Sequence, residues 1–127
     1  TRDEKAAAEP PPGMPGLETA LPLMLTAVEE GRLSLDRLVE LASTTPARLF
    51  GIPTAAESAV EVEVGPSWTL PDRGWQTKPD WSPFAGTTVR GRVVRTTLRG
   101  ATAWDEGRLL AAPGSGRVLS FAGAVVR

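Results

Sequence analysis

The run PPPGMPGLETALP at residues 10–22 joins a stiff loop to the start of a helix. Residues 10–16 hold four prolines and two glycines. Proline fixes φ, whereas glycine permits left-handed conformations and a close approach of the backbone to a neighbour. Such a loop presents main-chain groups, although many connections rich in proline and glycine only change the direction of the chain. We interpret residues 10–16 as a loop that exposes its backbone.

Three helical segments are expected before residue 53. The first begins near Glu18 or Thr19, which places Pro22 in its first turn, and Gly31 ends it. Its apolar stripe is Leu17, Leu21, Met24, Leu25 and Val28. The second has Ser34 as its N-cap and a buried stripe of Leu35, Leu38, Val39 and Ala42. Thr45-Pro46 predicts an N-cap and a short third helix, Pro46 to Phe50, that Gly51 closes.

After Pro53 the apolar period changes from helical spacing to alternation. Valines at 60, 62 and 64 alternate with Glu61 and Glu63, which predicts a half-buried strand that Gly65-Pro66 ends. Further strands are expected at 67–70, 87–98, 101–104 and 108–111, with hairpin turns at 99–100 and 105–107. Residues 72–86 predict an ordered loop pinned by Trp75, Trp81 and Phe84, and a stacking surface for sugars or bases is the alternative.

Composition limits the chemistry that this chain can perform alone. Among its 127 residues there is no histidine and no cysteine, so it lacks the usual zinc ligands and nucleophile pairs. Four close pairs of carboxylates remain, and we interpret them as surface groups rather than catalytic ones: Asp3/Glu4, Glu29/Glu30, Glu61/Glu63 and Asp105/Glu106. A net charge of −1 predicts neither nucleic-acid nor membrane binding. Absence of cysteine fits a reducing compartment.

Arginines 90, 92, 95 and 99 form a basic stripe on one predicted strand and its turn. A solvated strand face is the favoured interpretation, and contact with a neighbouring domain or a polyanion is the alternative. Because the chain starts at Thr1 rather than at a methionine, we also expect it to belong to something longer.

The order of residues in the loop closely resembles the segment after the eighth barrel strand of dihydroorotases. Five other stretches resemble this family in the same order: TRDEK at 1–5, EEGRLSLD at 29–36, PARLF at 46–50, WSPFAG at 81–86 and VRGRV at 89–93. The resemblance is strongest to the dihydroorotase domain of the multifunctional proteins that make pyrimidines.

This resemblance implies an α/β chain, the C-terminal piece of an amidohydrolase. Residues 1–53 would end a TIM-like barrel, 54–111 would form strands of a small β-sandwich, and 112–127 would be a tail or linker. Dihydroorotases are zinc enzymes that interconvert N-carbamoyl-L-aspartate and dihydroorotate by opening or closing a cyclic amide. In the family, an aspartate in an Asp-His-Ala-Pro-His run handles the proton. That run would stand immediately before Thr1, and the zinc ligands lie further upstream.

The resemblance therefore leaves one part of the active site in this chain. Main-chain groups of Pro12 and Gly13 would bind the substrate, with Met14 as a weaker candidate. Pro12 offers only its carbonyl, whereas Gly13 offers both an N–H and a carbonyl. No catalytic or metal-binding residue is carried over, so the chain alone is predicted to be inactive.

Partners and alternatives also follow from the resemblance. It implies a cytoplasmic homo-oligomer, joined in one polypeptide to aspartate carbamoyltransferase and carbamoyl-phosphate synthetase domains. One alternative is a dihydropyrimidinase or allantoinase, which would act on a different cyclic amide. The other is a non-catalytic, dihydroorotase-like scaffold for aspartate carbamoyltransferase.

Overall fold

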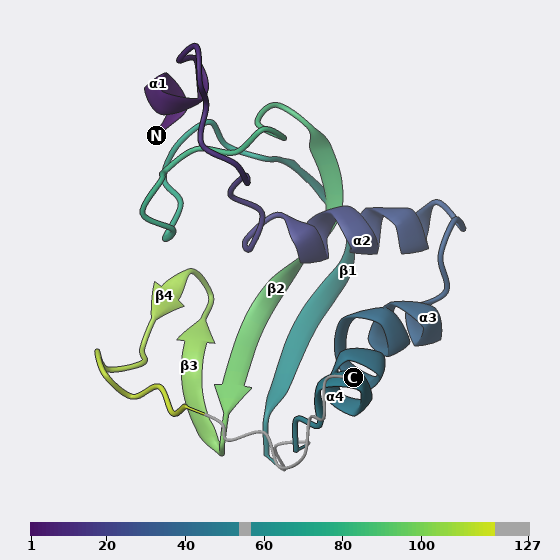
Figure 1. Ribbon diagram of the computed structural model, residues 1–127. Coiled ribbons are helices and arrows are strands. Elements are labelled where there is room, and N and C mark those ends of the chain that lie inside the picture. The colour runs from purple at the N-terminus through teal and green to yellow at the C-terminus, as the bar shows by residue number, and fades with distance from the viewer. Residues whose placement is uncertain (54–56, 119–127) are drawn as a thin grey trace.

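Helices precede strands throughout the chain (Figure 1). The computed structural model describes residues 1–53 and 57–118. Its elements are α1 (Arg2–Lys5), α2 (Ala20–Glu29), α3 (Leu35–Val39), η1 (Glu40–Thr44), α4 (Thr45–Phe50), β1 (Ala59–Thr69), β2 (Thr88–Leu98), β3 (Ala101–Asp105) and β4 (Arg108–Leu109). The strands form one antiparallel sheet in the order β1-β2-β3-β4. None of the helices in residues 1–53 and 57–118 has the length and hydrophobicity that a membrane span requires.

Helix α2 lies across β1 and β2 and supplies the centre of the core (Figure 1). Leu25 is completely buried, and the Thr26 hydroxyl accepts a hydrogen bond from the Arg90 N–H at 2.8 Å. The predicted start, the place of Pro22 in the first turn and the end at Gly31 are all confirmed. The stripe is wrong at Leu17, which precedes the helix and is 87% exposed.

The second and third predicted helices form one continuous helical run. The Ser34 hydroxyl caps it, accepting from the Arg37 N–H at 3.1 Å, and Gly51 ends it in a left-handed conformation, both as predicted. The predicted N-cap at Thr45 is wrong, because Thr44 and Thr45 are themselves helical. A π-helical turn, η1, joins α3 to α4. Such a turn accommodates Pro46, which has no N–H for a regular helical hydrogen bond.

The expected buried stripe of α3 is also largely wrong. Only Leu38 is buried; Leu35, Val39 and Ala42 are exposed. The reason is that, outside its own helical run, α3 contacts only α2 among the described elements. Periodicity therefore identified an apolar face correctly but not what covers it.

Strand β1 continues through the predicted stop at Gly65-Pro66, so that stop is wrong. Glu63 pairs with Arg92 and Ser67 pairs with Arg90. Three residues of β1, 64–66, therefore stand opposite Gly91 alone, as a bulge. A bulge accommodates Pro66, which cannot donate to the sheet, and lets pairing resume with the predicted strand around Trp68.

The remaining strands follow the predicted hairpins. Residues 99 and 100 both have positive φ, as do residues 106 and 107, which is the geometry of tight turns between antiparallel strands. The helix-then-strand order matches the prediction, and the described strands make a single sheet rather than a complete sandwich. Residues 54–56, at the predicted domain boundary, and 119–127, in the predicted tail, lie outside the described part of the chain.

Candidate functional site

The loop predicted to bind substrate lies on the surface. Pro12 and Gly13 are both exposed, and Gly13 has a φ of +85°. A Cβ placed on Gly13 would meet nothing within 4 Å. Met14 is exposed as well. The backbone of this loop is therefore accessible to a ligand or to another part of a larger protein.

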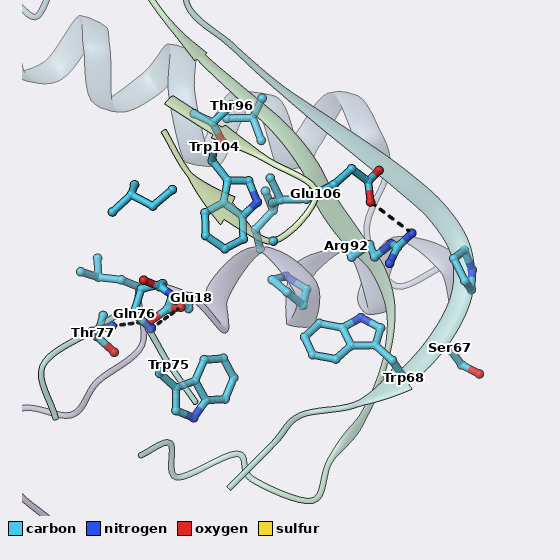
Figure 2. A pocket seen from close by; sticks show the side chains of 18 residues that line it. Glu18, Ser67, Trp68, Trp75, Gln76, Thr77, Arg92, Thr96, Trp104 and Glu106 are labelled. Atoms are coloured by element: carbon cyan, nitrogen blue, oxygen red, sulfur yellow. Dashed lines mark hydrogen bonds and ion pairs between the residues drawn. The ribbon is translucent and has the colours of Figure 1, made fainter. Parts of the chain in front are cut away.

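Thr19 and Glu18 hold the turn that leads from this loop into α2. Thr19 is 2% exposed, and its hydroxyl donates to the Gly16 carbonyl at 3.3 Å. The Glu18 carboxylate accepts from the N–H groups of Gln76 and Thr77 at 3.1 and 2.8 Å. Figure 2 shows Glu18 beside these two residues. Sequence reasoning missed this contact, because nothing in the spacing of residues relates position 18 to positions 76 and 77.

A second contact ties α1 to the same segment. Arg2 Nη2 donates to Asp72 Oδ1 at 2.5 Å. This hydrogen bond and the charge of Arg2 lower the pKa of the Asp72 carboxyl. In addition, the Lys5 ammonium donates to the Pro11 carbonyl. The segment at residues 72–77 is therefore contacted on both sides of the loop, by Arg2 before it and by Glu18 after it.

A hollow of about 920 Å³ opens between the start of α2, residues 75–77 and the sheet. Three tryptophans from different segments, Trp68, Trp75 and Trp104, line it (Figure 2). Trp68 Nε1 donates to the Gly91 carbonyl at 2.9 Å, whereas Trp75 Nε1 is buried and has no hydrogen-bond partner among residues 1–53 and 57–118. The aromatic residues of the 72–86 loop are partly buried, as predicted for side chains that pin it.

Two arginines of the stripe, Arg92 and Arg95, pair with nearby carboxylates. Arg92 donates to Glu63 at 2.9 Å and lies 4.0 Å from Glu106. Arg95 donates to Asp105 at 3.0 Å and lies 3.7 Å from Glu61. These contacts support the interpretation of the two arginines and their carboxylate partners as solvated surface groups rather than parts of a polyanion site.

The residues present do not fit a zinc ion. Within residues 1–53 and 57–118, no three carboxylates are grouped so that they could hold a metal. Histidine and cysteine are absent from the whole sequence. Any metal chemistry near the loop would depend on ligands from outside this chain.

Comparison with curated proteins indicates which kind of protein this chain is similar to. The chain is 45% identical over 116 residues to multifunctional protein pyr1-3 of Dictyostelium discoideum and 46% identical over 115 residues to multifunctional protein CAD of Squalus acanthias. Each match covers 91% of this chain and 5% of the relative. A dihydroorotase of Pyrococcus abyssi is 36% identical over 84% of this chain and 28% of its own length. The chain is dihydroorotase-like. No protein-family model matches it.

Solved structures agree with this assignment. The dihydroorotase-like chain superposes with a TM-score of 0.65 on the inactive dihydroorotase-like domain of the Chaetomium thermophilum CAD-like multifunctional protein. That match has 34% identity and covers 77% of this chain and 28% of the other. An L-hydantoinase (dihydropyrimidinase) from Arthrobacter aurescens gives a TM-score of 0.74 at 35% identity, over 78% and 24% of the two chains. The predicted resemblance to dihydroorotases is confirmed, and the fold is shared with hydantoinases. The chain spans well under a third of these relatives.

Proposed function

We propose that this chain supplies the substrate-side loop of a dihydroorotase, which interconverts N-carbamoyl-L-aspartate and dihydroorotate. The observation that carries the proposal is the 45–46% identity to multifunctional proteins pyr1-3 and CAD over 91% of the chain, which exceeds the 36% identity to a dihydroorotase and to D-phenylhydantoinases. Exposure of residues 10–14 in the stiff loop supports it, because a backbone that binds substrate must be accessible. Zinc, if the complete enzyme uses it, is held by ligands outside this chain.

Within that enzyme, Pro12 and Gly13 contact the substrate through their main-chain groups. Gly13 is suited to this role, since no side chain shields its N–H or its carbonyl. Proline on either side of the glycine restricts the loop, so less conformational entropy is lost when the substrate binds.

The larger arrangement is part of the same proposal. Residues 1–53 end the barrel, 54–111 belong to the β-sandwich, and 112–127 are a tail or linker. The match to multifunctional proteins supports fusion with other domains. We propose that these are aspartate carbamoyltransferase and carbamoyl-phosphate synthetase domains, and that the whole protein is a cytoplasmic homo-oligomer.

A chimera tests the proposed activity. The 36% identical part of the Pyrococcus abyssi dihydroorotase is replaced by this chain, and turnover of dihydroorotate is measured on purified, zinc-loaded protein. We expect turnover well above that of the same enzyme truncated before the replaced part. A folded, metal-loaded chimera without turnover would contradict the proposal. Hydantoin and dihydrouracil serve as competing substrates, and preference for either would favour the hydantoinase or dihydropyrimidinase alternative.

In this chimera, Gly13→Ala is expected to raise KM for dihydroorotate by about tenfold, equivalent to about 1.4 kcal/mol of binding free energy. The new methyl group lies where the substrate approaches. The control is Gly31→Ala. Gly31 also has a positive φ, +71°, and a Cβ placed on it would likewise meet nothing within 4 Å. Equal changes in KM for the two variants would show that backbone strain, and not substrate contact, is responsible.

The isolated chain is expected to hydrolyse no dihydroorotate above the buffer rate, with or without added zinc. The described residues offer no metal site and the sequence has no histidine. Turnover that co-purifies with the chain and disappears on chelation would overturn this expectation.

A second candidate function rests on one structural match, to a domain described as inactive. On this proposal the chain belongs to a non-catalytic scaffold for aspartate carbamoyltransferase. A chimera that folds and binds zinc but has no activity, together with co-purification of the chain with aspartate carbamoyltransferase, would favour this function.

A further inference from the structure

The loop at residues 10–15 is held in place from its ends. In the described part of the chain, no backbone–backbone hydrogen bond joins these six residues to the rest of the protein. Four of the six are prolines, which have no N–H to donate. The loop is therefore stiff within itself, but its position depends on the contacts that flank it.

Glu18 makes the flanking contact on the C-terminal side. Its two carboxylate oxygens each accept one N–H, Oε1 from Thr77 at 2.8 Å and Oε2 from Gln76 at 3.1 Å. Both donors lie almost sixty residues away along the chain. Hydrogen bonds from N–H groups to a carboxylate are shorter and stronger than neutral ones, and two together fix orientation as well as distance.

We propose that Glu18 is a positioning residue, which holds the Pro12–Gly13 backbone in its substrate-binding place by fastening the end of the loop to Gln76 and Thr77. The inference rests on the proposed substrate contact. Glu18 itself lies five residues beyond Gly13 and acts through the loop. On the N-terminal side, the contacts of Arg2 with Asp72 and of Lys5 with Pro11 complete the attachment.

Asp80 offers a matched comparison within the same segment. Its Oδ1 accepts from the N–H groups of Gly74 and Trp75 at 2.7 and 2.9 Å. Like Glu18, it therefore binds two consecutive backbone N–H groups between residues 74 and 77. It differs in having no hydrogen bond to the 10–18 stretch. Removing its charge disturbs the segment without releasing the loop.

The test compares Glu18→Gln with Asp80→Asn in the active chimera. The glutamine amide turns a donor towards one of the two N–H groups, so one hydrogen bond and the charge are lost. We expect Glu18→Gln to raise KM for dihydroorotate about tenfold while Asp80→Asn changes it less than twofold, because displacement of a binding group costs affinity. The unfolding midpoints of both variants are measured alongside. If KM is unchanged in Glu18→Gln while its stability falls, Glu18 is only structural and the inference is wrong.

A second measurement does not depend on activity. Amide NMR spectra of the full chain are recorded for the original sequence and both variants. We expect the Gly13 and Met14 amide resonances to shift, and their order parameters to fall, in Glu18→Gln but not in Asp80→Asn. An inactive original chimera would defeat the proposed function, whereas unchanged Gly13 and Met14 resonances in Glu18→Gln would defeat the positioning role.

Discussion

Replacing Gly91 by alanine is expected to destabilise the chain by about 3 kcal/mol. Gly91 is buried in β2 with a φ of +79°, a conformation that costs an L-residue roughly 1–2 kcal/mol. A Cβ there would lie 3.1 Å from the Glu63 carbonyl oxygen and 3.1 Å from Leu25 Cδ1. Overpacking of this kind adds about 1–3 kcal/mol. Urea denaturation of the two proteins measures the difference in the free energy of unfolding.

Gly114→Ala provides the control. Gly114 also has a φ of +79°, but a Cβ there would meet nothing within 4 Å. Backbone strain is thus common to the two variants, and the excess loss at position 91 measures the close approach of β1, at Glu63, and of α2, at Leu25, to Gly91. Similar losses at both positions would mean that the space around Gly91 relaxes without cost.

The second large effect is expected from Leu25→Ala, at about 3–4 kcal/mol. Leu25 is 0% exposed at the contact between α2 and the sheet, and truncation of a buried leucine loses its apolar burial and leaves a cavity. Leu49→Ala is the control, because Leu49 is 69% exposed and its loss is expected to stay within about 0.5 kcal/mol. Equal effects at the two positions would contradict the described core.

The double variant links these two predictions. Leu25→Ala removes Leu25 Cδ1, one of the atoms that the alanine Cβ at position 91 would meet. The Cβ of residue 25, 3.2 Å from that alanine Cβ, remains. We expect the double variant to lose less stability than the two single variants together, because the sites are in contact. Strict additivity would show that α2 and β2 are not packed as described.

Several features were predictable from local sequence. The Ser34 cap, the end at Gly51 and the hairpin turns depend on a few adjacent residues whose conformational preferences are strong. The loop at residues 10–16 was predictable for the same reason, because its prolines and glycines have strong conformational preferences. The resemblance to dihydroorotases also came from local runs of residues, and the comparisons bear it out.

Other features depended on contacts between distant residues. Strand β1 continues past Gly65-Pro66 because the bulge opposite Gly91 accommodates a proline. The α3 stripe stays mostly exposed because, outside its own helical run, only α2 contacts it in the described chain. The attachment of Glu18 to Gln76 and Thr77 was equally invisible, since the two N–H groups are backbone atoms that any residue would supply.

The sequence alone was therefore enough for the helical and strand periods, the Ser34 cap, the end at Gly51, the two hairpin turns, the family and the absence of histidine and cysteine ligands. The structural features among these depend on one residue or on a short run, whereas the family depends on several short runs and the missing ligands on the composition of the whole chain. The three-dimensional structure was needed to show which apolar side chains are buried, how β1 pairs past its proline and which residues Glu18 contacts after the loop. Burial and long-range hydrogen bonds join segments far apart in the chain, and no local preference specifies which segments meet.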